Sequence, residues 1–362
     1  MEIKKINLTL PRHWNACTRE QLEMIASVMC DQVERQDRYH PFDMRNVKIA
    51  LFFAFTGLEI VKGVNPAVPM GEQHYTCRLR DTKKNPWWKF WRRRIKPCND
   101  DTFSLFLWQI NYWLSPKAET NDKTSAEYMA QGKGILDWLD NDHGIFLTRF
   151  MYDEVNLRKS GEWWKPKRIF HGPGTDLDGF SWAQYRFATD TMQSYTQLSN
   201  SLLRMKEMQK FSDEQIMKQI HNVDMAKSMF LATIFNGKTK YVDTNTGMVK
   251  YDYHYESNQC TDNAQYFRNF PETEWQVILF WWTGMMHTLS KRYPHVFKVQ
   301  KVGKKKKPST PLEIYTATTA TMQKYAGLTE DQVNNQSYSL VLEHLERLSK
   351  ENEEMEKIRR KK

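Results

Sequence analysis

Apolar residues recur at spacings of three and four along most of this chain, and this spacing constrains the fold more than any other feature. It places apolar side chains on one face of an α-helix. Such stripes run from Leu22 to Met29, from Phe103 to Leu114 and from Trp275 to Leu289. Few positions interrupt them, since the 362 residues include only 15 glycines and 13 prolines. We therefore predict a mainly α fold with a multi-helix body.

Local start signals support two of these helices. Thr18 and Gln21 have the spacing of a capping box, in which each side chain bonds the backbone of the other residue. Ser212 is followed by Asp213 and Glu214, as is typical of an N-cap and an acidic first turn. We expect helices to begin at both positions.

Two segments depart from the helical period. Tyr251, Tyr253 and Tyr255 alternate with polar residues after the turn sequence Asn245–Gly247, which predicts a small β-hairpin at about residues 238–256. A further strand is expected at residues 74–79, leading into a basic, tryptophan-rich insertion at about residues 62–100 of the helical body.

The length of the chain favours two domains, because one hydrophobic core rarely serves so many residues. We predict an N-terminal helical domain at residues 1–155, which includes the insertion. A loop or boundary follows at residues 156–179, where HGPGTDLDG holds three glycines. The C-terminal helical domain then covers residues 180–362, with the hairpin and a terminal amphipathic helix.

That terminal helix carries a short heptad pattern. Its seam alternates spacings of three and four and consists of Tyr338, Val341, Leu345, Leu348, Asn352 and Met355. The pattern covers too few heptads to establish a coiled coil. Docking on the helix's own domain and self-association of two chains both remain open.

The positive charge of the chain is concentrated in two segments. Residues 78–96 contain nine basic residues and one acidic residue, and residues 298–307 contain six lysines and no acid. The whole chain carries only +10, so the remainder is net negative. In the first segment aromatic and basic residues are interleaved, as in proteins that bind single-stranded nucleic acid or anionic surfaces. Its candidate residues are Trp87, Trp88, Lys89, Trp91, Arg92, Arg93 and Arg94.

The cellular compartment of the protein is predicted from its apolar runs, its N-terminal pattern and its cysteines. No apolar run reaches the roughly 20 residues of a membrane span, and no signal-peptide pattern follows Lys4 and Lys5. The five cysteines form no closely spaced pair, which favours free thiols over a disulfide framework or a zinc site. We expect a cytoplasmic protein without a membrane span, metal or cofactor.

Methionine and tryptophan are unusually frequent, with 18 and 13 residues respectively. Methionine adapts to varied apolar partners, and tryptophan supplies a large contact area, so this enrichment is typical of protein-binding surfaces as well as of cores. We predict a groove that holds an apolar helix. Its candidate residues are Met205, Met208, Met217, Met225, Met229, Trp281, Trp282, Met285 and Met286.

Motifs for phosphate binding, zinc hydrolysis and serine nucleophiles are absent from the sequence. We therefore predict that the protein is not an enzyme. A nucleic-acid-binding protein using the Trp87–Arg94 segment is the main alternative. A metal-dependent hydrolase comes third, because His171, Asp176 and Asp178 share one glycine-rich loop.

Four segments spread over much of the chain follow one another in a recognisable order. They read LPRHWNACTREQLEMIASVM, GFSWAQYRFATDTMQSY, SKRYPHVFK and GLTEDQVNNQSYSLVLEHL. In this order they resemble helical proteins that prophages of Bacteroidetes encode beside their tail genes, and which are similar to tail assembly chaperones. The resemblance implies a non-enzymatic role in bacteriophage tail assembly. It implies the tape-measure protein or tail-tube subunits as partners.

Overall fold

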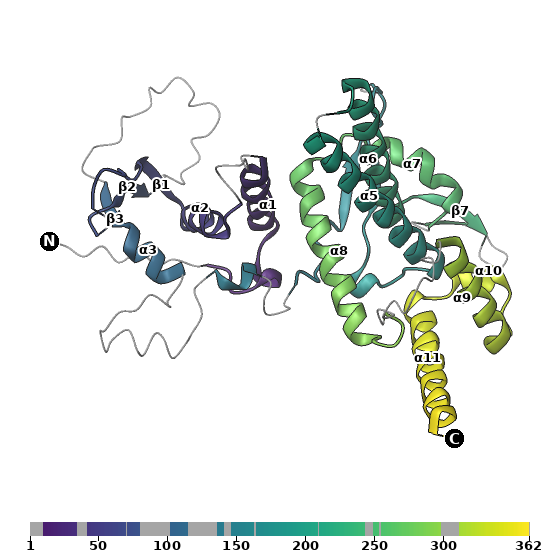
Figure 1. Cartoon of the computed structure of the whole chain (residues 1–362). Coiled ribbons are helices and arrows are strands. Elements are labelled where there is room, and N and C mark those ends of the chain that lie inside the picture. The colour runs from purple at the N-terminus through teal and green to yellow at the C-terminus, as the bar shows by residue number, and fades with distance from the viewer. Residues whose placement is uncertain are drawn as a thin grey trace. The chain divides into compact units, whose positions relative to one another are not determined.

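The chain divides into two compact units, Met1–Leu147 and Thr148–Lys362 (Figure 1). The computed structural model describes residues 10–34, 42–69, 71–79, 102–114, 136–140, 146–162, 164–208, 210–242, 249–252, 255–297 and 311–361. Helices make up most of these residues, which confirms the predicted mainly α fold.

Among its described residues, the first unit contains three helices and a small sheet. The helices and short 3₁₀ turns are η1 (Trp14–Ala16), α1 (Arg19–Glu34), α2 (Met44–Thr56), α3 (Leu107–Leu114) and η4 (Asp137–Asp140). The capping box predicted before α1 is present. The Thr18 backbone N–H donates to Gln21 Oε1 at 2.9 Å, and the Gln21 backbone N–H donates to Thr18 Oγ1 at 3.2 Å. Leu22, Ile25 and Phe52 lie in the core of this unit.

The sheet of the first unit corrects two sequence-based expectations. Its antiparallel strands, in the order β1-β2-β3, are β1 (Leu58–Lys62), β2 (His74–Leu79) and β3 (Phe103–Phe106). The strand predicted at residues 74–79 is confirmed, but it is the central strand and not part of a peripheral insertion. The helix expected from Phe103 begins only at Leu107, because residues 103–106 pair with β2 in the register Cys77↔Phe103. This long-range ladder overrides the local apolar spacing.

A buried lysine ties η4 to α2. Lys48 Nζ lies 2.9 Å from Asp137 Oδ1 and 2.6 Å from Asp140 Oδ2. Burial alone lowers the pKa of Lys48, but hydrogen bonds to the two carboxylates outweigh burial and raise it above its ordinary value. Asp137 and Asp140 thus neutralise a buried lysine.

The second unit is built around long helices. Its helices and 3₁₀ turns are η5 (Thr175–Leu177), α5 (Trp182–Met208), α6 (Asp213–Ile234), η6 (Ser257–Gln259), α7 (Cys260–Phe267), α8 (Glu272–Arg292), α9 (Pro311–Ala326), α10 (Glu330–Asn335) and α11 (Tyr338–Lys361). Its strands are β4 (Glu154–Leu157), β5 (Arg168–His171), β6 (Asn236–Gly237), β7 (Thr239–Val242) and β8 (Val249–Asp252). Residues 156–179, expected as a loop or boundary, therefore contain strand β5 and lie inside this unit.

The strands form two antiparallel groups. The predicted hairpin is confirmed by the pairing of β7 with β8, and β4, β5 and β6 form a separate three-stranded sheet. Close packing next to this sheet requires glycine at position 172. A Cβ atom there would meet the Phe150 ring and lie 2.5 Å from the Tyr152 carbonyl oxygen. The sheet is thus held tightly against the segment that precedes it.

Aromatic residues dominate the core of the second unit. Phe230 contacts the rings of Trp275 and Trp282 edge-on, with centroids 5.7 Å and 5.1 Å away. Phe150 contacts Trp281 at 4.5 Å, and Phe235 stacks on Phe267 at 5.5 Å. These pairs join α6, α7 and α8 and place Trp275, Trp281 and Trp282 in the core.

The first turns of α11 dock on the loop before α5. The Tyr338 hydroxyl donates to the Asp176 carbonyl at 2.5 Å, and the Tyr338 backbone N–H donates to the Phe180 carbonyl at 3.2 Å. Tyr338 and Val341 at the start of the heptad seam are buried, whereas Met355 near its end is 52% exposed. The beginning of the seam is thus used within the unit, and its end is not.

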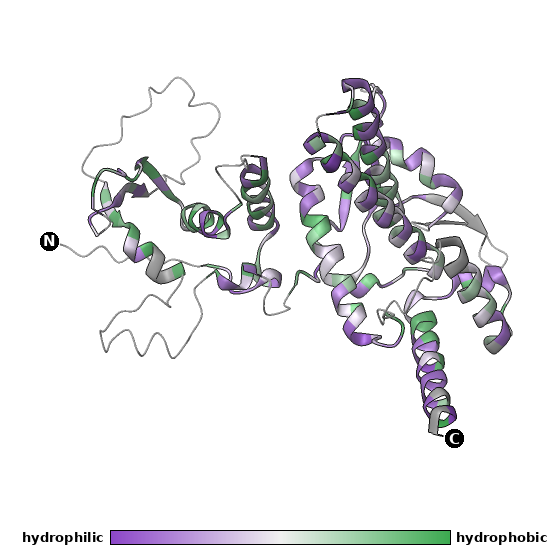
Figure 2. Ribbon diagram, in the orientation of Figure 1, coloured by the Kyte–Doolittle hydropathy of each residue, from purple (hydrophilic) through white to green (hydrophobic). Residues whose placement is uncertain are grey.

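No helix among the described residues combines the length and apolar character needed to cross a membrane. The long helices of the second unit carry hydrophobic and hydrophilic residues along their length (Figure 2). This distribution is typical of helices that bury one face and expose another.

Candidate protein-binding surface

Helices α5 and α6 form an antiparallel hairpin whose outer part projects from the second unit (Figure 1). The turn between them is fixed by the predicted N-cap. Ser212 Oγ accepts from the Gln215 backbone N–H at 3.3 Å, and the Gln215 side chain accepts from the Ser212 backbone N–H at 3.0 Å. This reciprocal pair satisfies two of the N–H groups that the first turn of a helix leaves free.

The outer half of the hairpin is here called the distal arm. It comprises residues 193–208 of α5 and residues 210–225, which contain the end of the turn and the first 13 residues of α6. None of these described residues is buried. Between the helices, half-buried residues form a stripe at helical spacing on each side: Tyr195, Leu198, Leu202 and Met205 on α5, and Ile216, Ile220 and Val223 on α6. The distal arm therefore has an inner seam but no further layer covering it among the described residues.

Large apolar side chains on the distal arm are exposed. They are Leu203, Met208, Phe211, Met217 and Met225. Scattered exposed apolar residues are normal on a protein surface, but five within one two-helix arm are typical of a site that contacts another protein.

The methionines predicted for a groove separate into two groups. Met208, Met217 and Met225 are exposed on the distal arm, and Met205 is half-buried in its inner seam. Met229 is half-buried where α6 enters the body of the unit. Four of the predicted residues thus lie on the distal arm, and a fifth, Met229, lies further along α6.

The predicted groove residues on α8 do not belong to this surface. Trp281, Trp282 and Met285 are core residues with exposed fractions of 2%, 5% and 2%. Met286 is half-buried, and its sulfur lies 3.8 Å from the Tyr185 hydroxyl. Trp281 and Trp282 are neighbours in the sequence and point in different directions from α8. Both are buried, because other elements pack against α8 on several sides. A partner has no access to these three side chains.

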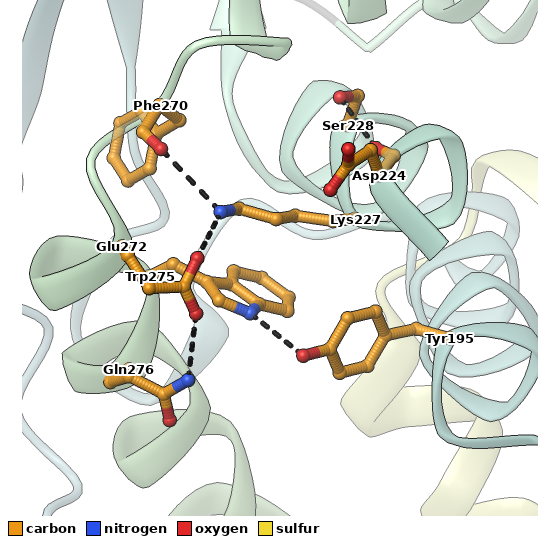
Figure 3. A network of polar contacts seen from close by, with 8 residues as sticks. All are labelled: Tyr195, Asp224, Lys227, Ser228, Phe270, Glu272, Trp275 and Gln276. Atoms are coloured by element: carbon orange, nitrogen blue, oxygen red, sulfur yellow. Dashed lines mark hydrogen bonds and ion pairs between the residues drawn. The ribbon is translucent and has the colours of Figure 1, made fainter. Parts of the chain in front are cut away.

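A polar network anchors the base of the distal arm to α8 (Figure 3). Lys227 Nζ lies 2.6 Å from Glu272 Oε2 and 3.4 Å from the Phe270 carbonyl oxygen, and 5.7 Å from the centre of the Trp275 ring. The Trp275 indole N–H donates to the Tyr195 hydroxyl at 3.1 Å. Burial raises the pKa of Tyr195, so this hydroxyl stays neutral at physiological pH.

Sequence reasoning missed this network. Lys227 and Glu272 are 45 residues apart, and Tyr195 and Trp275 are 80 apart. No local spacing brings such residues together, so only the packing of α8 against both arm helices reveals the contacts.

Two of the residues that suggested catalysis make contacts within the fold. Asp178 Oδ1 accepts from the Gly179 backbone N–H at 3.0 Å, and His171 Nε2 lies 3.8 Å from Glu154 Oε2. Within the described part of the chain, no three His, Cys, Asp or Glu side chains are grouped to hold a metal ion. The tryptophan-rich basic segment, including Trp87 to Arg94, lies outside the described residues.

The buried thiols are not arranged as nucleophiles. Burial raises the pKa of Cys17 to about 12 and that of Cys77 to about 11. Both therefore stay protonated at neutral pH, whereas a reactive cysteine requires the thiolate.

Comparisons of this chain with protein-family models, with curated proteins and with solved structures find no match.

Proposed function

We propose that this protein is a non-enzymatic binding protein that holds an apolar helical segment of a partner on the distal arm. The observation that carries the proposal is the set of exposed apolar side chains on an arm that no further layer covers among the described residues. A third helix laid on a two-helix hairpin completes a small bundle and removes apolar area from water. Helix-in-groove binding of this kind is a common mode of protein recognition.

The resemblance to tail assembly chaperones supports a specific partner. A tape-measure protein presents long apolar helical surfaces that are prone to aggregate before the tail assembles. We propose that the distal arm binds such a surface in the host cell and keeps the partner soluble. A tail-tube subunit is the second partner that the resemblance suggests.

Co-expression with the tape-measure protein of the same locus tests the proposal. Wild-type protein is expected to raise the soluble fraction of this partner several-fold. A Leu203→Glu, Met217→Glu variant is expected to lose most of the effect, because a charged side chain opposes burial of the surrounding apolar area. Circular dichroism at matched temperature verifies that the variant is folded.

The matched control is Met355→Glu, which changes an exposed methionine on α11. It is expected to behave as wild type. Equal partner solubility with wild-type protein, with the double variant and with no added protein contradicts the proposed function.

A further inference from the structure

Helix α8 covers one side of the inner half of the α5–α6 hairpin, and its N-terminal end lies about halfway along the hairpin. Near its C-terminal end Met286 contacts Tyr185 of α5, and near its start Trp275 contacts Tyr195 and Glu272 contacts Lys227. Both helices of the hairpin continue past this point (Figure 1). The continuation spans residues 196–208 of α5, which is about 20 Å at 1.5 Å per residue.

On α5 the side that faces α8 continues to Leu203. Leu203 follows Tyr185 by 18 residues, which is about five turns of an α-helix, so the two side chains point the same way. Leu203 is 58% exposed. Met208 is also 58% exposed, but five residues further on it points about 140° away from Leu203.

On α6 the corresponding side carries Met217. Met217 and Asp224 are seven residues apart, close to two turns, so they share one side of the helix. Asp224 stands one turn before Lys227, which contacts the first turn of α8 (Figure 3). Met217 is 63% exposed. Leu203 and Met217 therefore border the side of the arm that continues beyond the N-terminal end of α8.

The α6 edge of this side is acidic. Asp213 lies four residues before Met217, one turn away, and Asp224 lies seven residues after it. Both aspartates are exposed, and the Glu272 side chain at the start of α8 is 59% exposed. On the α5 edge, the basic residues Arg204 and Lys206 lie one and three residues after Leu203, and Glu207 lies four residues after it. Positive charge on the flank of a bound partner that faces α6 therefore favours binding.

We propose that this side of the distal arm, bordered by Leu203 and Met217, binds an amphipathic helix of a partner protein in line with α8. The partner helix directs large apolar residues at the arm, as α8 does with Trp275, and carries lysine or arginine along the flank that faces Asp213 and Asp224. This inference rests on the proposed function and specifies the side of the arm and the charge of the partner.

Two synthetic peptides serve as probes. Both are fluorescein-labelled helices of about 18 residues with leucines at helical spacing, one with lysine and the other with glutamate at the remaining positions. Fluorescence anisotropy with the full chain is expected to show binding of the lysine peptide and binding at least about tenfold weaker for the glutamate peptide, since tenfold corresponds to about 1.4 kcal/mol. Asp213→Lys with Asp224→Lys is expected to reverse this preference.

Leu203→Glu and Met208→Glu form a matched pair, because the two side chains are equally exposed on the same helix. Leu203→Glu is expected to weaken the lysine peptide about tenfold, and Met208→Glu by less than about twofold. A larger loss with Met208→Glu places binding on the other side of the arm and overturns the inference. Equal binding of both peptides, or binding of neither, also overturns it.

The oligomeric state supplies an independent outcome. Light scattering during size-exclusion chromatography is expected to give the same mass for wild type and for the Leu203→Glu, Met217→Glu variant. A wild-type dimer that this variant converts to monomer shows that a second copy occupies the surface, which also overturns the inference. Failure of these peptide tests leaves the co-expression result standing, so the inference and the proposed function fail separately.

Discussion

At the scale of single residues, the base of the distal arm depends on Lys227 and its partner. Lys227 is 8% exposed, while the Glu272 side chain is 59% exposed. Removing the charge of Glu272 leaves a buried ammonium group beside the Phe270 carbonyl and the Trp275 ring. Removing the lysine leaves a carboxylate that water can solvate.

We therefore expect Glu272→Gln to destabilise the second unit more than Lys227→Met. The expected loss for Glu272→Gln is about 1–2 kcal/mol in the free energy of unfolding, because the pair is partly open to solvent. Urea denaturation of both variants measures the difference. A greater loss for Lys227→Met contradicts the assignment of Lys227 as a buried charge stabilised by this carboxylate.

Gly172 is required by close packing. Gly172→Ala is expected to cost about 2 kcal/mol or more, because the new methyl group meets the Phe150 ring and the Tyr152 backbone. Gly71→Ala is the control, since nothing lies within 4 Å of a Cβ atom at that position. Thermal denaturation followed by circular dichroism compares the two, and equal melting temperatures contradict the packing described for Gly172.

The docking of α11 gives the fold a predictable response to acid. Burial alone raises the pKa of Glu346, but hydrogen bonds from the His295 side chain and from the backbone N–H groups of Val296 and His295 outweigh it and lower the pKa below 4.5. Because the pKa of Glu346 is lower in the folded state than in the unfolded state, the ionised carboxylate stabilises the fold at pH values above the unfolded-state pKa. This stabilisation is lost as the pH falls through the folded-state pKa.

Glu346→Gln is therefore expected to destabilise the fold at pH 7 and to differ progressively less from wild type as the pH falls below about 4.5. Urea midpoints measured between pH 3 and pH 7 test this expectation. A difference that stays constant over this range contradicts a stabilising role for the Glu346 carboxylate.

At the scale of elements, the start of a helix could be predicted where its capping residues lie within three positions of each other in the sequence. Thr18 and Gln21 form the expected reciprocal bonds, and Ser212 is the expected N-cap, which also bonds reciprocally with Gln215. The strand at Phe103 was not predicted, because its partner β2 is distant in the sequence and the apolar spacing of residues 103–114 fits a helix equally well. Trp281 and Trp282 of α8 were predicted to line a groove but are buried, because the sequence pattern does not distinguish a core tryptophan from an exposed one.

The distal arm is expected to open locally more often than the rest of the hairpin. Its residues are not buried, whereas Ala226 to Ile234 of α6 are mostly buried. Amide hydrogen exchange is expected to be faster in residues 213–225 than in residues 226–234. Ser212→Ala is expected to increase exchange further in the first turns of α6, because loss of an N-cap costs about 1 kcal/mol. Uniform exchange along α6 contradicts this description.

At the scale of the whole molecule, the two units carry different parts of the sequence-based hypotheses. The second unit holds the four predicted methionines that gather on the distal arm. The first unit includes the range of the tryptophan-rich basic segment, which lies outside the described residues, so the nucleic-acid hypothesis stays a prediction. The distal arm could not be located from the sequence, because this surface depends on how far α8 extends along α5 and α6.

The central claim is that the distal arm is where a helical partner binds. Amide hydrogen exchange of the full chain, measured alone and in complex with the co-expressed tape-measure protein, tests it most directly. We expect slower exchange in residues 196–208 and 213–225 of the complex, because a bound helix reduces local opening of the arm. Unchanged exchange in both segments, with protection elsewhere in the chain, contradicts the account.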